Sequence, residues 1–251
     1  RKAMHHFFVE PGQMEGEQVR ITGPDVNHMK NALRMKAGEQ FLVSDGQGGD
    51  YLCRLEELDA GRALGRILEK RESAELPSSI WLYQGLPKSD KMEFIIQKAA
   101  ELGAAAVVPV VTRNTVVKLD AKKAKERVRR WQAIAESGAK QSKRSRIPQV
   151  GEVLTFEEAL EDMERRGFDF KLVPYENQEG MAATKRIFDS LKPGMSVAVM
   201  IGPEGGFDPL EIEKAQEAGA EPISLGRRIL RTETAAVTML SALMLKLEEG
   251  I

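Results

Sequence analysis

Three polar turns in the C-terminal half of the chain each follow a short apolar run. They read "LVPYEN" (172–177), "VMIGPEGGFDPLE" (199–211) and "LGRRILRTETAA" (225–236). In open α/β sheets, ligands bind beyond the carboxyl ends of the strands, and glycine lets the backbone come close to a ligand. If the three apolar runs are strands of one sheet, their turns are therefore expected to form one binding site.

The third turn carries three cations, Arg227, Arg228 and Arg231, just before an apolar segment that predicts a helix from about residue 232. Thr232 or Thr234 could cap that helix, and Glu233 favours its positive end. An arginine outside a helix start gains nothing from the helix dipole, so we expect an anionic or electron-rich partner there. A solvated arginine is the alternative. The helix's apolar stripe is typical of core or of a subunit interface, and comprises Val237, Leu240, Leu243, Met244 and Leu247.

The GPEGG turn matches neither the dinucleotide pattern GxGxxG nor a Walker A loop, which disfavours a nucleotide-binding oxidoreductase. Taken alone, it could be a glycine turn before a helix, with Asp208 as the N-cap and Pro209 at the first helical position. Its company of two further irregular strand ends favours a ligand site.

A basic region runs from Lys118 to Arg146. It holds eleven Lys and Arg against three Asp and Glu, a local charge of +8 in a chain of net charge −1. A solvated helix face usually mixes signs at i,i+4 spacing, and this region hardly does. We therefore interpret it as a surface for a phosphate backbone, extending into the loop-like "KQSKRSR" (140–146).

The composition is that of a soluble globular protein, with 42% hydrophobic and 30% charged residues. One cysteine, Cys53, excludes a disulfide framework and fits a reducing cytoplasm. The three histidines lack zinc-like spacing, so no metal site is expected. No apolar run has membrane-spanning length, and no leader precedes the first strand, so we expect no membrane association.

The elements that must position these turns fall into two groups. Residues 4–70 show short strands and one helical stretch (25–35), which predicts a small β-barrel. A polar linker (71–79) follows. From residue 80, strands at 80–86, 105–111, 170–176, 195–202 and 221–226 alternate with helices at 90–103, 124–142, 156–166, 181–191, 208–219 and 232–249. This alternation predicts an α/β fold with a mostly parallel sheet.

The chain resembles the bacterial 16S ribosomal RNA (uracil-N3)-methyltransferases, the RsmE type of the SPOUT or α/β-knot superfamily. The resemblance covers almost the whole chain and combines GPEGG with LGxRILRTETA. Further segments follow in the family's order: "GLPKSDKMEFIIQKAAELG" (85–103), "RNTVV" (113–117), "KKAKERVRRWQAIAE" (122–136) and "QSKRSRIPQV" (141–150). Two positions depart from the family: Asn27-His28 stands for a His pair, and Lys140 for a Glu.

The resemblance implies a PUA-like β-barrel RNA-binding domain over 1–72 and a SPOUT trefoil-knot methyltransferase domain over 73–251. It implies a cytoplasmic homodimer that uses S-adenosylmethionine (SAM) to methylate N3 of a uridine in 16S rRNA of the 30S subunit, without metal. By position, the SAM-binding residues are Leu172, Pro174, Tyr175, Glu176, Ile201, Gly202, Pro203, Glu204, Gly205, Leu225, Gly226, Ile229, Leu230, Arg231, Thr234 and Ala235. The RNA-binding candidates from the basic region are Lys122, Lys123, Arg127, Arg130, Lys143, Arg144 and Arg146.

For this reaction we predict Arg231 and Glu233 as catalytic residues. Uracil N3 is a poor nucleophile until its proton leaves, and a guanidinium on the flanking carbonyl oxygens favours the deprotonated ring. Arg227 and Arg228 are reserves for Arg231, and Glu204 or water could accept the proton in place of Glu233. The alternatives are a SPOUT enzyme acting at another RNA position, such as a ribose 2′-oxygen, and a non-catalytic ribosome-assembly factor.

Overall fold

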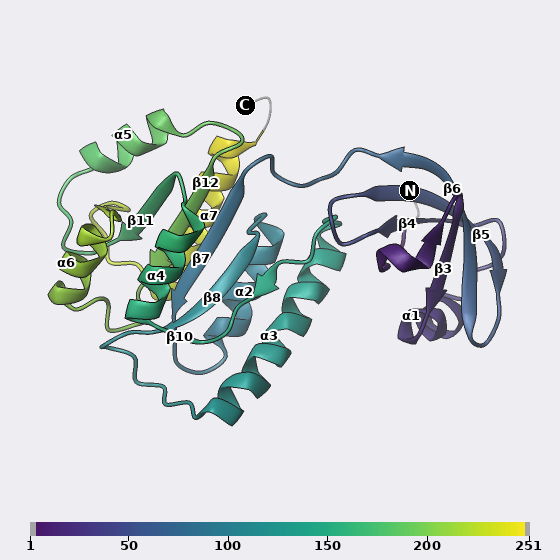
Figure 1. Cartoon of the computed structure of the whole chain (residues 1–251), viewed down its shortest axis with the longest axis horizontal. Coiled ribbons are helices and arrows are strands. Elements are labelled where there is room, and N and C mark those ends of the chain that lie inside the picture. The colour runs from purple at the N-terminus through teal and green to yellow at the C-terminus, as the bar shows by residue number, and fades with distance from the viewer. Residues whose placement is uncertain (1–3, 249–251) are drawn as a thin grey trace. The chain divides into compact units, whose positions relative to one another are not determined.

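The computed structural model describes residues 4–248 of the chain (Figure 1). The predicted domain limits 1 and 251, and the predicted helix end at about 249, lie outside these residues. The chain divides into two compact units. The first contains the chain up to Glu75 together with Ala139–Ile147, and the second contains Leu76–Gly138 and the chain from Pro148 onward.

The first unit is built on a six-stranded sheet in the order β1-β4-β5-β6-β3-β2. Only the β1–β4 pair is parallel. Alternation in β3 buries Val19 and Ile21 in one core with Phe41. The predicted helix is shorter than expected, with α1 continuing as a single π-helical turn. The elements are β1 (His6–Phe8), a 3-10 turn (Pro11–Gln13), β2 (Met14–Glu15), β3 (Gln18–Thr22), α1 (Pro24–Asn27), the π-helical turn (His28–Ala32), β4 (Gln40–Ser44), β5 (Asp50–Leu58) and β6 (Arg62–Arg71).

The second unit contains a parallel sheet in the order β10-β8-β7-β12-β11-β13, with β9 also paired to β8. The alternation of strands and helices predicted this arrangement, and the α/β fold class with a separate small β domain is confirmed. The elements are β7 (Ser79–Gly85), α2 (Lys91–Glu101), β8 (Ala106–Val111), α3 (Ala121–Gln141), β9 (Gln149–Val150), β10 (Leu154–Thr155), α4 (Phe156–Arg166), β11 (Phe170–Pro174), α5 (Ala182–Ser190), β12 (Ser196–Ile201), α6 (Pro209–Glu217), β13 (Glu221–Ile223) and α7 (Thr232–Leu247).

Helices pack on both faces of this sheet, because successive side chains of a strand point to opposite faces. In β7, Ile80 and Leu82 belong to a core completed by α2, α3, α5 and α7, whereas Tyr83 belongs to a second core completed by α4 and α6. The stripe of α7 is mainly internal core, since Leu240, Leu243 and Leu247 are buried. Buried strands of this kind fix where their carboxyl ends emerge.

The second core contains a buried ionic group. Asp162 of α4 is 5% exposed and accepts hydrogen bonds from the Tyr83 hydroxyl (2.8 Å) and Arg166 Nε (2.8 Å), and also from Arg165. The Arg166 guanidinium lies 3.9 Å above the centre of the Trp81 ring. Burial raises the pKa of Asp162, but the hydrogen bonds from Arg166, Tyr83 and Arg165 outweigh that effect and leave this pKa below its ordinary value.

Replacing Asp162 by Asn is expected to lower the free energy of unfolding at neutral pH by about 1–3 kcal/mol, since buried donors lose a charged acceptor. The folded pKa of Asp162 lies below the unfolded one. Its contribution is therefore present above about pH 4 and is lost as the pH falls through the folded pKa. Urea denaturation between pH 3 and 7 should show a smaller acid loss in Asp162→Asn than in wild type. Glu161→Gln, on an exposed position of the same helix, should keep the wild-type pH profile.

Candidate active site

The three predicted turns line one cavity of about 970 Å³ in the second unit. They follow β12, β11 and β13, which are neighbouring parallel strands, so their carboxyl ends meet at one edge of the sheet. The starts of α2 and α7 add Lys91, Thr232 and Ala235 to the wall. The sheet order therefore confirms the expectation that the three turns lie together.

Glycine permits the closest approach of two of these segments. A Cβ at Gly85, the last residue of β7, would lie 2.6 Å from Pro203 Cδ and 2.7 Å from the Pro203 backbone nitrogen. Within the GPEGG turn, a Cβ on Gly202 would lie 3.2 Å from the carbonyl carbon of Gly206, which itself has φ of +65°. The turn after β12 is thus held against the end of β7 with no room for a side chain between them.

A buried hydroxyl joins this turn to α7. Thr232 Oγ1 accepts a hydrogen bond from Gln84 Nε2 (2.8 Å) and donates to the Gly202 carbonyl (2.7 Å). The predicted capping of α7 by Thr232 or Thr234 is wrong. The N-cap is Arg231, which makes no side-chain cap bond, and the Thr232 hydroxyl donates instead to the Gly202 carbonyl. The predicted cap of α6 is confirmed, with Asp208 accepting from the Leu210 N–H (3.0 Å).

Asn114, in the segment after β8, fixes the other side of the GPEGG turn. Its Nδ2 donates to the Gly205 carbonyl (3.0 Å) and also lies 3.3 Å from the Gly206 carbonyl. The neighbouring Arg113 N–H donates to Glu211 at the start of α6 (2.8 Å). Asn114 belongs to the RNTVV motif (113–117), but no local sequence pattern predicts this contact.

Lys91 is a cavity residue that the sequence analysis missed. Its ammonium lies 3.1 Å from Glu204 and 3.5 Å from Glu233. Glu204 also accepts from the Lys88 N–H at 3.0 Å. Burial raises the pKa of Glu204, but the backbone N–H groups of Glu204 and Lys88 and the Lys91 ammonium outweigh it and hold that pKa below its ordinary value. Glu204 is therefore a stably ionised carboxylate at the cavity wall.

Glu233 does not belong to the cavity wall. Its Oε2 is buried and lies 3.5 Å from the Lys91 ammonium. This position suits a residue that orients Lys91 better than one that accepts a proton from a ligand.

The arginines of the third turn are exposed at the cavity. Arg227, Arg228 and Arg231 all line it, and between them Ile229 is 84% exposed. Gly226 has φ of +110°, a backbone conformation that favours glycine, and starts this excursion after β13. The turn therefore presents three guanidinium groups to any ligand that enters the cavity.

Most of the predicted SAM-binding residues line the cavity, but three do not. Leu172 is buried in the core below the strand end, Thr234 is exposed outside the cavity, and Gly205 faces Asn114. Their contact with SAM stays a prediction. Besides Lys91, the wall contains residues that the sequence analysis did not assign to SAM: Gln178, Glu179, Gly180, Met181, Gly206, Phe207, Ser224, Arg227, Arg228 and Thr232.

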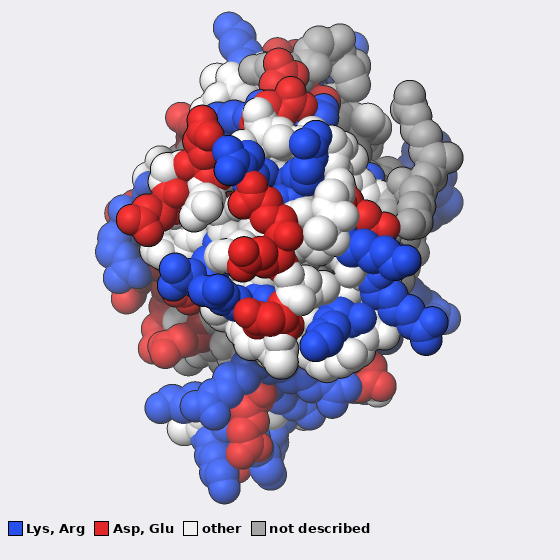
Figure 2. All heavy atoms as spheres, turned by 90° about the vertical axis from the view of Figure 1, so that its right-hand side faces the viewer, with Lys and Arg blue, Asp and Glu red and all other residues white. Residues whose placement is uncertain are grey.

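The first half of α3 presents the basic region predicted to bind RNA. Lys122, Lys123, Arg127 and Arg130 are exposed there, although Arg130 is paired with Glu93 (2.8 Å) and Lys123 lies 3.7 Å from Asp120. Figure 2 shows Lys and Arg crowding the lower end of the view, the level at which α3 begins in Figure 1. The helix thus carries a strongly positive surface with few acidic side chains.

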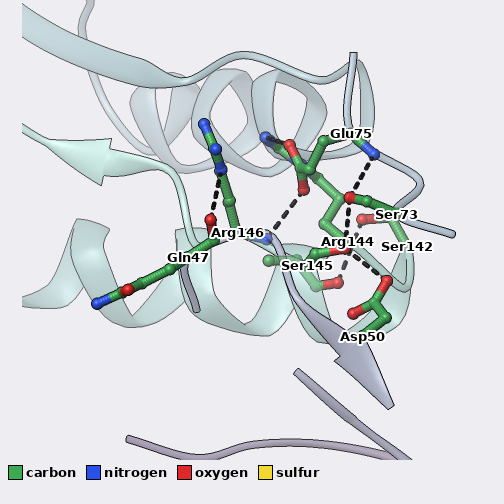
Figure 3. A network of polar contacts seen from close by, with 9 residues as sticks. Gln47, Asp50, Ser73, Glu75, Ser142, Arg144, Ser145 and Arg146 are labelled. Carbon is green, nitrogen blue, oxygen red and sulfur yellow. Dashed lines mark hydrogen bonds and ion pairs between the residues drawn. The ribbon is translucent and has the colours of Figure 1, made fainter. Parts of the chain in front are cut away.

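The end of the basic region belongs to the first unit. Arg144 is 4% exposed, and its Nε and Nη2 donate to Glu75 at 3.1 and 2.6 Å (Figure 3). This burial points to a structural role, and contact of Arg144 with RNA stays a prediction. Its neighbours Lys143 and Arg146 are exposed.

Within residues 4–248, no three His, Cys, Asp or Glu side chains cluster in a way that could hold a metal ion. In the same part of the chain, none of the helices combines the length and the apolar character needed to cross a membrane.

Known proteins share both units. The sequence profile of an RNA methyltransferase domain matches residues 74–244, and that of an RNA methyltransferase PUA domain matches residues 21–68. Ribosomal RNA small subunit methyltransferase E of Bacillus subtilis is 38% identical over 252 residues, 98% of either chain. The Mycobacterium tuberculosis protein of that name is 31% identical over 94% of this chain and 89% of its own.

A solved structure extends the likeness to three dimensions. Ribosomal RNA small subunit methyltransferase E from Neisseria gonorrhoeae, bound to S-adenosyl methionine, is 34% identical over 96% of both chains, with a TM-score of 0.80. The sequence profiles, the relatives matched over nearly the whole chain and the fold all indicate the same family. The chain therefore belongs to the RNA methyltransferases of the ribosomal RNA small subunit methyltransferase E family.

Proposed function

We propose that the chain transfers a methyl group from SAM to N3 of a uridine in 16S rRNA. The observation that carries this proposal is the cavity formed by the three turns, the third of which presents exposed arginines. The Neisseria gonorrhoeae relative binds SAM, and the relatives are named for the RNA of the small ribosomal subunit. A bacterial enzyme with that substrate would act in the cytoplasm.

The cavity suits SAM in size and chemistry. Its volume of about 970 Å³ lies at the upper end of ordinary ligand pockets. Ile201, Leu225 and Leu230 give it apolar walls, while the turns around Gly202 and Gly226 offer backbone donors and acceptors. Ionised Glu204 adds a negative charge that a cationic ligand tolerates well. When bound, SAM supplies a reactive methyl group on a sulfonium centre.

The chain's own part in the chemistry is to activate the uracil. Removing the N3 proton spreads negative charge over the flanking carbonyl oxygens, and the exposed Arg231 guanidinium can donate hydrogen bonds to them. Glu204 lines the cavity but has a lowered pKa, which makes it a weak proton acceptor. In this proposal the proton leaves to water and Glu233 orients Lys91. N3 lies on the pairing edge, so the base must be unpaired or flipped out.

RNA would be held by the cations of α3 and by Lys143 and Arg146. We also propose that two chains pair, as the family resemblance implies, and that 16S rRNA of the 30S subunit is the substrate. Exposed apolar side chains such as Phe94 of α2 and Leu245 of α7 are candidates for the contact between copies.

The deciding experiment is incubation with labelled SAM and 30S particles that lack the modification, followed by identification of the nucleoside. N3-methyluridine supports the proposal. A ribose 2′-O-methyl nucleoside would identify a different RNA position, and no binding of SAM by calorimetry would identify a non-catalytic assembly factor.

Arg231→Ala is expected to retain SAM binding by calorimetry while methylation falls at least a hundredfold, since one preorganised donor to a developing oxyanion has an effect of that order. Arg227→Ala and Arg228→Ala, at the same cavity, are the matched comparisons and should lose less. Near-wild-type activity of Arg231→Ala would transfer the role to one of these neighbours.

Gly85→Ala is expected to weaken SAM binding roughly tenfold or more, because the new Cβ would overlap backbone of the GPEGG turn, and overpacking of this kind costs about 1–3 kcal/mol. Gly61→Ala is the control, since the nearest atom to a Cβ there lies 3.9 Å away. Calorimetry with SAM measures both variants. Equal affinities would show that the turn moves freely.

Reversing the charges of Lys123, Arg127 and Arg130 to Glu is expected to weaken binding of 16S rRNA and to flatten its salt dependence. Each lost phosphate contact should lower the slope of log K against log salt by about 0.7–0.9. The control reverses Lys185, Arg186 and Lys192, exposed residues in and after α5, for the same change in net charge. An equal effect in both variants would place the RNA surface elsewhere.

A further inference from the structure

The segment Ala139–Ile147, which begins in the last turn of α3, packs into the first unit, beside residues almost a hundred positions earlier in the chain. It ends the basic region, and its side chains differ sharply in exposure. Lys143 and Arg146 are exposed, whereas Arg144 and Ser145 between them are buried. The buried pair is held by two carboxylates, Asp50 and Glu75 (Figure 3).

Asp50, at the start of β5, is 9% exposed and lies at the centre of a row of hydrogen-bonded side chains. It accepts hydrogen bonds from Ser145 Oγ (2.5 Å) and from Ser44 Oγ. Because both hydroxyls donate to the carboxylate, each must accept from its other partner. Ser73 Oγ (2.8 Å) therefore donates to Ser145, and His6 Nε2 (2.6 Å) donates to Ser44. Acceptance by the Asp50 carboxylate thus sets the direction of the other hydrogen bonds in this row.

Glu75 holds the same segment from the other side. Besides the Arg144 guanidinium, it accepts the backbone N–H of Arg146 at 2.9 Å. Arg146 Nε in turn donates to the Gln47 carbonyl (3.2 Å). The guanidinium lies over the hairpin turn before β5, where a Cβ on Gly48 would be 3.1 Å from Arg146 Nε.

These contacts hold a strained turn. Lys143 has φ of +58°, a left-handed conformation that disfavours residues with a side chain by about 1 kcal/mol. The anchored residues directly after it, Arg144 and Ser145, keep it there. Its side chain is exposed, so the turn presents two cations, Lys143 and Arg146, to solvent.

We propose that Asp50 and Glu75 are positioning residues for RNA binding: the two carboxylates hold the turn so that Lys143 and Arg146 meet neighbouring phosphates of the rRNA backbone. This inference rests on the proposed RNA-binding function of the basic region. The benefit is preorganisation, because ordering two long cationic side chains and a loop at the moment of binding would weaken affinity.

The inference predicts a change in RNA affinity that is opposite in sign to the change expected from net charge alone. Removing a carboxylate makes the protein more positive, which by charge alone tightens binding to a polyanion. Asp50→Ala and Glu75→Ala are expected instead to weaken binding of an unmodified 16S rRNA transcript five- to fiftyfold and to lower its salt slope. Glu72→Ala removes the same charge from an exposed position nearby and should leave affinity unchanged or slightly tighter.

A double-mutant cycle separates positioning from general damage. The double variant Lys143→Ala with Arg146→Ala should by itself weaken RNA binding. Adding Asp50→Ala to that pair should have little further effect, because Asp50 is proposed to act by positioning those two cations. Hydrogen–deuterium exchange should rise across residues 139–147 in the carboxylate variants, while SAM binding, a property of the second unit, stays at the wild-type level.

Ser145→Ala is the mild variant, to be used if Asp50→Ala or Glu75→Ala disturbs the first unit as a whole. It removes one hydroxyl and should reproduce the loss of affinity in smaller measure. Wild-type or tighter RNA binding in all three variants, or full additivity in the cycle, overturns the inference. If the Lys143 and Arg146 variants also bind RNA normally while methylation of 30S particles persists, the turn is no RNA contact but the proposed activity stands.

Discussion

The Thr232 hydroxyl is the contact through which the cavity becomes one structure. It is buried, it accepts from Gln84 at the end of β7, and it donates to Gly202 at the end of β12. The hydroxyl thereby joins three segments that are far apart in the sequence: the end of β7, the end of β12 and the start of α7. A buried donor or acceptor left unpaired costs more than its bond contributes, so this triple junction tolerates few arrangements. The close packing of Gly85 against Pro203 adds a steric limit at the same place.

Charge is distributed around this rigid junction in an ordered way. The carboxylates of Glu204 and Glu233 face Lys91 at the start of α2, whereas the arginines of the third turn are exposed on the remaining wall. The ion pairs lie beside the backbone of the GPEGG turn. The exposed arginines line the part of the cavity that an electron-rich ring could enter. In the proposed reaction, the first group of residues would help to hold the cofactor and the arginines would polarise the substrate.

The sequence predicted the sheet, the meeting of the three turns and most of the cavity wall, because strand ends and glycine turns depend on local pattern. It did not predict Lys91, whose position depends on how α2 packs beside two distant loops. The capping of α7 was wrong for a related reason: Thr232 satisfies local rules for a cap, but tertiary contacts take its hydroxyl. Arg144 looked like its basic neighbours, and only the fold shows that Glu75 buries it. The trefoil knot stays a prediction, since nothing in a periodic pattern reveals threading.

The return of residues 139–147 to the first unit has a consequence for synthesis of the chain. The ribosome completes all six strands of the first sheet before α3 has emerged. Asp50 and Glu75 are therefore made before their partners in residues 139–147 have been translated. During that interval the row of hydroxyls around Asp50 is incomplete and open to water. A fragment ending at residue 75 would therefore lack the Ser145 hydroxyl and the Arg144 guanidinium that Asp50 and Glu75 bind in the complete chain.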